Sequence, residues 1–189
     1  LALRGDTSSA DDFLKLDDGW VAQLLDPANG AHIVDFHDDG GNPQTVDATL
    51  FQKAIKALPT KYALRDLRWI ATPKLIYDYR HYLASRQDNL GAAVLMGRAE
   101  LTPEGIPFFG TGERLGVPYL PEDLGTGNNE TVVILADPKV FWFIVHREFR
   151  LESERVPSKD RWEFYGHGYF DFIVSNFDAV VIVKGVTYA

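Results

Sequence analysis

The sequence predicts an α+β fold in which a mixed sheet is flanked by helices and closed by long strands late in the chain. Three observations support this prediction. The chain has 189 residues, of which 46% are hydrophobic, enough for a domain with a substantial core. Apolar spacing at its centre follows the order helix, strand, helix, and its last third contains runs with strand periodicity. No internal repeat appears, which excludes solenoids and propellers.

The first quarter predicts an ordered loop, a short apolar segment and one strand. Residues 4–19 are dense in Asp, Ser and Gly, with Phe13 and Leu14 among them. The apolar segment 20–25 ends at turn residues. Residues 31–36 then alternate weakly like a strand, and residues 37–43 (HDDGGNP) form a loop.

The centre of the chain carries the clearest patterns. A helix begins after Asp47, whose side chain can cap it, and Pro59 stops it. Residues 67–71 (LRWIA) predict a short buried strand, and Thr72-Pro73 supplies the N-cap and first-turn proline of a second helix. The apolar positions at helical spacing are Leu50, Phe51, Ala54, Ile55 and Leu58 in the first helix, and Leu75, Ile76, Tyr79, Tyr82 and Leu83 in the second.

The second half predicts a loop followed by strands. Residues 110–129 are punctuated by Gly and Pro, so we expect a long surface loop there. Residues 149–154 alternate between apolar and charged side chains, as a half-exposed strand does. The remaining expected elements are a buried strand at 132–135, a turn at 137–138, an apolar run at 140–145, a polar turn at 157–160 and two final strands at about 162–174 and 179–183.

Composition excludes several classes of protein. The absence of cysteine excludes disulfide scaffolds, thiolate zinc sites and cysteine nucleophiles. No apolar stretch is long enough for a membrane span, and no leader pattern opens the chain. The net charge is −8, and residues 1–50 contain two basic and ten acidic side chains. The basic residues between Lys53 and Arg86 are dispersed at helical spacing, which indicates a solvated helix face rather than a nucleic-acid site.

The sequence begins at Leu1, and Met96 is its single methionine, so we expect a processed or truncated product.

Motifs for catalysis or cofactor binding are weak, and we predict no catalytic, cofactor-binding or metal residues. The run 110–116 (GTGERLG) has its third glycine one position late for GxGxxG, and no helix pattern follows it. His37-Asp38-Asp39 is the densest group of metal-ligand types, but adjacent loop residues rarely converge on one ion. His167 lies in a predicted strand. The tripeptide Arg4-Gly5-Asp6 matches a cell-adhesion motif and is short enough to occur by chance.

Aromatic residues suggest an assembly surface. The run Phe141-Trp142-Phe143 stands beside His146-Arg147, and large protein–protein interfaces favour aromatics and arginine. Core packing is the alternative use for these rings. Together with the loop, the candidate interface residues are Gly110, Gly112, Glu113, Arg114, Tyr119, Phe141, Trp142 and Arg147.

The order of these elements resembles the C-terminal two thirds of a tailed-bacteriophage major capsid protein of the Hong Kong 97-type fold. Four places carry the resemblance. They are residues 1–7 leading to Asp18-Gly19-Trp20, the helix 47–58 followed by Trp69-Ile70-Ala71-Thr72-Pro73, the pair Gly105-Ile106-Pro107-Phe108 and Pro118-Tyr119-Leu120-Pro121, and the strands from 135–154 and 162–186. The family's N-terminal arm, E-loop and most of its spine helix have no counterpart in this sequence.

The resemblance implies a division into three parts and a mechanical function. Residues 1–46 would belong to the peripheral domain and a connecting loop, 47–175 to the axial domain with a capsomer-centre loop at 110–129, and 176–189 to the terminal strand. The function implied is that of a viral structural protein, the major capsid protein of a bacteriophage virion, self-assembling into an icosahedral capsid around double-stranded DNA. It needs no cofactor, and the E-loop lysine required for cross-linking is absent.

Partners and location also follow from the resemblance. The chain would form pentamers and hexamers with itself, in the host cytoplasm, and would work with a scaffolding protein, a portal and a maturation protease. Packaged DNA would be near it without specific contact, and no membrane is involved. Three alternatives stay open: an encapsulin-type cellular compartment, a small metal-dependent hydrolase using His37 with Asp38 or Asp39, and a generic adaptor domain.

Overall fold

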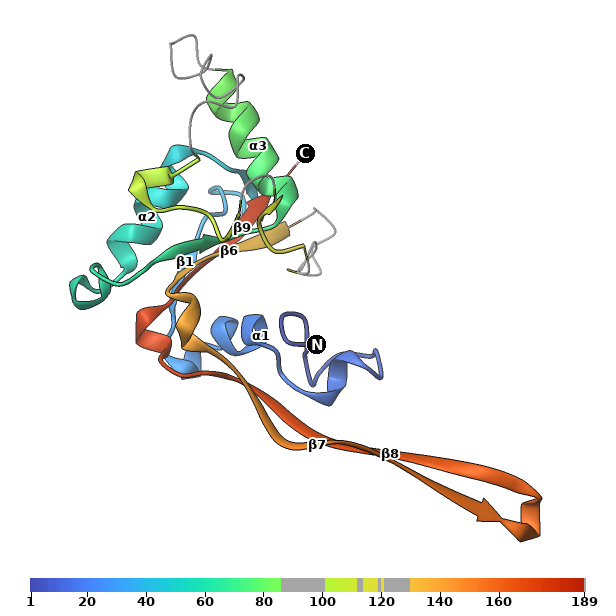
Figure 1. The fold of residues 1–189 in the computed structure, drawn as a ribbon. Helices are drawn as coiled ribbons and strands as arrows, with labels where there is room; N and C mark the ends of the chain where they lie inside the picture. The colour runs from blue at the N-terminus through green and yellow to red at the C-terminus, as the bar shows by residue number, and fades with distance from the viewer. Residues whose placement is uncertain (86–100, 112–113, 119, 121–129, 189) are drawn as a thin grey trace.

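The computed structural model describes residues 1–85, 101–111, 114–118, 120 and 130–188. It has two parts: a body built on one sheet, and a long hairpin that projects from it (Figure 1). The helices are α1 (Trp20–Leu25), α2 (Ala48–Ala57) and α3 (Pro73–Ala84). The strands are β1 (His32–Asp35), β2 (Gln44–Thr45), β3 (Arg68–Ile70), β4 (Gly110–Thr111), β5 (Arg114–Leu115), β6 (Glu130–Ala136), β7 (Phe141–Val156), β8 (Arg161–Val174) and β9 (Val181–Thr187).

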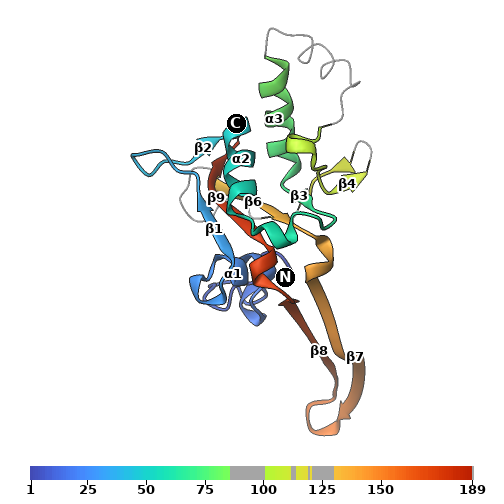
Figure 2. The same ribbon diagram turned by 90° about the vertical axis from the view of Figure 1, so that its left-hand side faces the viewer.

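The body is a five-stranded mixed sheet with the order β1-β9-β6-β3, and β2 continues the β1 edge. β1 and β2 run parallel to β9, whereas β6 runs antiparallel to both β9 and β3. All seven residues of β6 are buried, as are most of β9, so both faces of these central strands are covered. Helix α2 packs across β9 and β1, and α3 stands beside the β3 edge (Figure 2). The predicted α+β fold class, with a mixed sheet flanked by helices, is confirmed.

Local chemistry starts both long helices where the sequence predicts. The Asp47 carboxylate accepts hydrogen bonds from the backbone N–H groups of Thr49 and Leu50, which satisfies two donors of the first turn of α2. The Thr72 hydroxyl accepts from Leu75 N–H at the start of α3, and Pro73 occupies the first helical position.

An aromatic cluster joins the helices to the sheet. The ring of Phe51 lies 4.8 Å from that of Trp69 and 4.8 Å from that of Tyr79, with edge-to-face geometry. Trp69 is fully buried, and its indole N–H donates to the carbonyl oxygen of Pro103. Phe108 completes the cluster from the segment 101–109, which runs beside β3. The predicted strand at 67–71 is therefore a core element.

The predicted surface loop at 110–129 is partly wrong. β4 and β5 pair as a two-residue ladder, and the backbone N–H of Val117 donates to the carbonyl oxygen of Ala71 over 2.8 Å. Leu120 is fully buried. This stretch packs on the body because its alternating apolar residues Leu115 and Val117 reach the core, a pattern that Gly and Pro counts conceal. Residues 121–129 lie outside the described part of the chain.

The hairpin consists of β7 and β8, which pair antiparallel from Phe141 with Val174 to Val156 with Arg161. The apolar run at 140–145 and the strand at 149–154 belong to one sixteen-residue strand, β7. Its irregular register between Val145 and Arg150 accounts for the change of pattern between the two segments. No helix in the described residues is long and apolar enough to span a membrane.

Candidate assembly surface

The hairpin is amphipathic because residues two apart on a strand share a face. On β8, the residues Trp162, Phe164, Phe170 and Phe172 alternate with Glu163, Tyr165, Asp171 and other polar positions. Cross-strand pairing places Phe143 opposite Phe172 and Leu151 opposite Gly166, on the same side of the ribbon. We call this side the aromatic face, defined by Phe143, Leu151, Trp162, Phe164, Phe170 and Phe172. It extends along the twist of the ribbon for about 33 Å between Trp162 and Phe172.

Near the body, the rings of the aromatic face pack on one another. Phe143 stacks on Phe172 with ring centroids 5.2 Å apart, and Phe170 meets Phe172 edge-on at 5.7 Å. Only Phe172 is buried in this group. Farther out, the side chains of the face have no such cover: Trp162 is 59% exposed, Phe164 66% and Leu151 65%. Among the described residues, most of the large hydrophobic side chains that are exposed lie on this hairpin.

An exposed apolar strip of this length is unusual on a monomer. Contiguous apolar patches of more than a few hundred Å² mark surfaces that bind another protein or a membrane. A two-stranded hairpin is also only marginally stable in water unless another element packs against it. The distal half points away from the body (Figures 1 and 2), so the described part of its own chain does not cover it.

The opposite face of the hairpin is mostly polar and ionic. The Glu163 carboxylate accepts hydrogen bonds from the Tyr165 hydroxyl at 2.6 Å and from the Arg161 guanidinium at 2.7 Å. These bonds hold the pKa of Glu163 below its ordinary value. They also offset the repulsion between Glu163 and Glu154, which are directly opposite each other across the ribbon. The tip is thus polar on one side and aromatic on the other.

The structure divides the predicted interface residues into three groups. Phe141, Trp142 and Arg147 are all on β7, but the strand alternation sends Phe141 and Trp142 to opposite faces. Phe141 is half-buried, whereas Trp142 is 53% exposed and its indole N–H donates to the carbonyl oxygen of Lys139. Gly110 and Arg114 are backbone members of the small β4–β5 ladder. Gly112, Glu113 and Tyr119 lie outside the described residues, and the assignment of all eight to an interface stays a prediction.

Sequence reasoning missed the β8 residues of the aromatic face. Trp162, Phe164 and Phe170 were available in the alternation of residues 162–174, which predicts a strand with one apolar side. What the alternation does not reveal is whether that side packs on the same chain.

His37, which the hydrolase alternative would use with Asp38 or Asp39, contacts two other carboxylates in the structure. One imidazole nitrogen contacts the Asp35 carboxylate, and the other lies 3.3 Å from Glu130 Oε1. Asp38 instead accepts hydrogen bonds from Gly40 and Asn42 within its own turn. In the described residues no group of three or more His, Asp or Glu side chains has the arrangement of a metal site. His37 therefore links Asp35 of β1 to Glu130 of β6.

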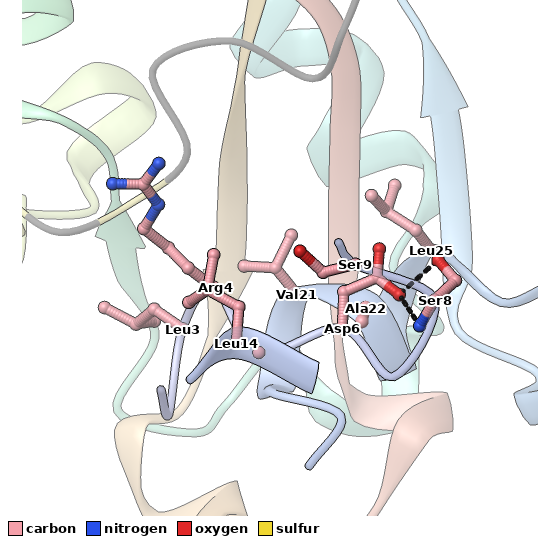
Figure 3. A pocket seen from close by; sticks show the side chains of 10 residues that line it. Leu3, Arg4, Asp6, Ser8, Ser9, Leu14, Val21, Ala22 and Leu25 are labelled. Atoms are coloured by element: carbon pink, nitrogen blue, oxygen red, sulfur yellow. Dashed lines mark hydrogen bonds between the residues drawn. The ribbon is translucent and has the colours of Figure 1, made fainter. Parts of the chain in front are cut away.

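The first nineteen residues fold into a loop whose polar groups bind one another. A hollow of about 410 Å³ lies between this loop and α1, with Leu14, Val21 and Leu25 in its lining (Figure 3). The Asp6 carboxylate beside it accepts hydrogen bonds from both the backbone and the hydroxyl of Ser8, which lower its pKa. Because Asp6 is already bound within the loop, the Arg4-Gly5-Asp6 tripeptide is a structural turn here.

Comparison with known proteins shows that the chain is similar to proteins of viral capsids. The chain is 29% identical over 157 residues to a Bacillus subtilis (strain 168) protein described as "Putative prophage capsid protein YqbE", covering 82% of this chain and 46% of that protein. No family model matches the chain.

Two solved structures share the fold at low sequence identity. A chain of the satellite phage P4 procapsid with its size determination (Sid) protein superposes with a TM-score of 0.62 at 16% identity, covering all of this chain and 57% of that one. A chain from the capsid of a native GTA particle gives 0.53 at 14% identity, covering 84% and 50%. The chain thus spans about half the length of the proteins it matches. Its relatives in sequence and fold are structural capsid proteins rather than enzymes, and the chain has the Hong Kong 97-type capsid fold that its sequence resembles.

Proposed function

We propose that this chain is part of the major capsid protein of a tailed bacteriophage, which assembles with itself into an icosahedral shell around packaged double-stranded DNA. The observation that carries the proposal is the projecting hairpin with its uncovered aromatic face. The capsid relatives and the capsid fold support it from an independent direction.

The proposed occupant of the distal aromatic face is a second copy of the protein. Leu151, Trp162 and Phe164 are the residues farthest from the body on this face, and together they form an apolar contact beside the ionic tip. Burial of each such side chain contributes roughly 1.5–3 kcal/mol. A shell multiplies this modest contact over many symmetric copies, which is how weak interfaces close a stable container.

The remaining parts take their roles from this assignment. We infer that the sheet body is the axial domain, and that residues 1–25 with the hairpin form the peripheral part. In this division β1 and β2 belong to the axial domain, and not to the peripheral domain that the resemblance implies for residues 1–46, because both strands pair with β9. The segment 110–129 would lie at the five-fold or six-fold axis of pentamers and hexamers. The net charge of −8 suits a container that releases its DNA, since clusters of basic residues would bind phosphates tightly.

Location and partners complete the proposal. The shell would assemble in the host cytoplasm and persist in the virion, with a scaffolding protein, a portal and a maturation protease as assembly partners. An encapsulin-type compartment would use the same fold with protein cargo in place of DNA, and the experiment below separates the two.

The test is electron microscopy of the protein expressed from its gene with all flanking coding sequence. We expect closed shells or five- and six-membered rings, and nuclease-protected DNA in particles made during phage growth. Shells that hold protein and no DNA would replace the phage assignment with the compartment, and a uniform population of small particles would overturn the shell altogether.

A pair of substitutions tests the aromatic face within that experiment. Trp162→Ser with Phe164→Ser should leave thermal unfolding of the body unchanged and abolish shell formation. Tyr77→Ser is the matched control, because Tyr77 is an equally exposed aromatic residue (61%) on α3, away from the hairpin. If the double variant assembles as well as the control, the distal face is not the contact between copies. If a photo-cross-linking residue placed at either position attaches to its own polypeptide rather than to a second copy, the flanking residues are the occupant.

A further inference from the structure

Helix α1 contacts the hairpin at the root of the hairpin, where the two strands leave the body. The Trp20 ring lies between two hairpin rings, 5.3 Å from that of Phe141 on β7 and 5.8 Å from that of Phe172 on β8. It therefore contacts both strands of the ribbon at the level where they leave the body (Figure 1). Paired aromatic rings in these tilted and edge-on geometries stabilise one relative orientation of the elements that carry them.

Two polar side chains hold the open edge of β8 at the same level. The Gln23 amide donates a hydrogen bond of 2.5 Å to the carbonyl oxygen of Phe172 and a second of 2.8 Å to that of Asp18. The Asp17 carboxylate faces the backbone N–H of Phe172. The carbonyl group of Phe172 thus points away from β7 and is satisfied by Gln23 of α1, as a third strand would satisfy it.

The segment after β8 is fixed to the body by a second cluster. The Asp178 carboxylate lies 3.0 Å from His32 Nε2 and 2.5 Å from Lys61 Nζ, and it accepts from the Tyr62 hydroxyl. Asn176 donates to the same hydroxyl. This cluster holds the segment after β8 in place, whereas the root of the ribbon itself is held by Val174, which is buried in the core, and by the α1 contacts.

Trp20 is less buried than the residues that anchor α1 in the core. Val21 and Leu24 are the residues of α1 that are buried in the core, whereas Trp20 is half-buried. Its indole N–H has no hydrogen-bond partner in the part of the chain that the structure describes. The ring lies at the margin of the core, and its ring contacts are with Phe141 and Phe172 of the hairpin.

We propose that Trp20 and Gln23 are positioning residues that set the angle between the hairpin and the body, and that through this angle they set the curvature of the assembled shell. The first half concerns the chain alone, and the second half rests on the proposed function. A strand of sixteen residues spans about 50 Å, so a rotation of about 10° at the root moves the tip by about 9 Å. A displacement of that size changes which part of a neighbouring copy the distal face meets.

The chain is suited to a direct distance measurement because it contains no cysteine. Lys56→Cys on α2 and Ser158→Cys at the hairpin tip, both exposed, place spin labels on the body and on the ribbon. In the unassembled protein we expect one narrow distance distribution. Trp20→Ala should broaden it at least two-fold, Gln23→Ala should broaden it less, and Trp20→Phe should restore most of the narrow distribution. Trp162→Ala, which removes an indole from the far end of the hairpin, is the matched control and should leave the distribution unchanged.

The outcomes separate this inference from the proposed function. An unchanged distribution in Trp20→Ala and Gln23→Ala overturns the positioning role even if the protein forms shells. If Trp20→Ala fails to fold, Gln23→Ala and Trp20→Phe decide the question, because neither removes a buried core side chain. In assembled material the same variants should give shells of mixed diameter where the parent gives one size. Broad distances combined with shells of unchanged diameter would overturn the link to curvature.

Discussion

The sheet body and the hairpin use the same apolar residue types, but the body buries most of them and the hairpin leaves most of them exposed. Trp69 in β3 is fully buried against Phe51, whereas Trp162 in β8 is 59% exposed. Strand β6 has no exposed residue, and β8 has Phe172 and Val174 as its fully covered positions. The body thus has a buried core of its own, while the hairpin carries an apolar face that the described part of the chain leaves exposed.

This difference separates stability from assembly within one small chain. Burial of apolar surface is the dominant favourable term in folding, so body residues should govern the free energy of unfolding. Exposed residues of the hairpin contribute little to that free energy, and their apolar surface becomes useful only in a complex. Substitutions in the two regions should therefore produce different failures.

The largest expected contrast is between two tryptophan substitutions. Trp69→Ala should lower the free energy of unfolding by about 3–5 kcal/mol, because it empties a buried site and leaves the Pro103 carbonyl without its donor. Trp162→Ala should change that free energy by less than about 0.5 kcal/mol. Chemical denaturation measures both. Equal losses in the two variants would break the distinction between body and hairpin.

The close packing of the body should appear at Gly185, where β9 passes His37. Gly185 has φ of +79°, and an added Cβ would lie 2.6 Å from His37 Nδ1. Gly185→Ala should cost about 2–4 kcal/mol, from left-handed strain and overlap together. Gly30→Ala, at a similar φ of +78° but with open space around it, should cost only about 1–2 kcal/mol. Thermal unfolding of the two variants gives the difference between their stability losses. Equal losses would show that His37 can move away from the added Cβ at no cost in stability.

Helix capping in the body gives a smaller effect. Asp47→Ala removes the acceptor of two backbone N–H groups at the start of α2 and should cost about 1 kcal/mol. Asp47→Asn keeps a side-chain oxygen in the same place and should cost much less. Urea denaturation at neutral pH checks the pair. An effect of Asp47→Ala on the spin-label distances would show that α2 also influences the hairpin.

Asp35 predicts acid sensitivity of the body. Hydrogen bonds from the backbone and side chain of His37 lower the pKa of Asp35 from 3.8 to about 2. Its ionised form therefore stabilises the fold above about pH 4, and this contribution is lost as the pH falls toward 2. Asp35→Asn should be less stable than the parent at pH 7, and the two should converge near pH 2 in urea titrations. A constant difference across this range would rule out the carboxylate charge as the cause.

Asp17, at the hairpin root, should show the opposite sign and the smallest effect. Burial, and then the nearby Asp171 carboxylate, raise the pKa of Asp17 above 3.8. The ionised form therefore destabilises the root at neutral pH, and the cost disappears as the pH falls below the raised pKa. Asp17→Asn should be slightly more stable than the parent at pH 7 and equal to it in acid. The exposed Asp12→Asn is the control, and an identical gain there would indicate a general charge effect.

Local signals predicted the body well. Asp47 and Thr72-Pro73 mark helix starts because a cap acts on its own first turn, and residues 67–71 reveal a strand by their apolar run. The parallel pairing of β1 with β9 was not predictable, because the alternation at 31–36 indicates a strand but carries no information on which strand pairs with it. Leu120 was placed in a surface loop because the surrounding glycines outweighed its apolar neighbours.

The candidate surface was harder to predict for a geometric reason. Phe141 and Trp142 are adjacent in sequence, so the strand turns them to opposite sides, one toward Trp20 and the other to solvent. A cluster along the sequence is therefore not a cluster on the surface. The residues that do share a face, Trp162 and Phe164 with Phe170, are spaced by two or more, and whether they are exposed depends on what packs beside the ribbon.

The position of β9 bears on how the protein is made. His32 pairs with Val181, and β9 lies between β1 and β6, so this central strand leaves the ribosome after the other described strands of the sheet. During translation the apolar strand β6 and the aromatic hairpin emerge before the sheet can close around them. The nascent chain therefore exposes β6 and the hairpin, which are its most aggregation-prone segments, before β9 has been made. Loss of a few residues within 181–187 should leave insoluble protein, whereas loss of as many residues at the hairpin tip should leave a soluble body.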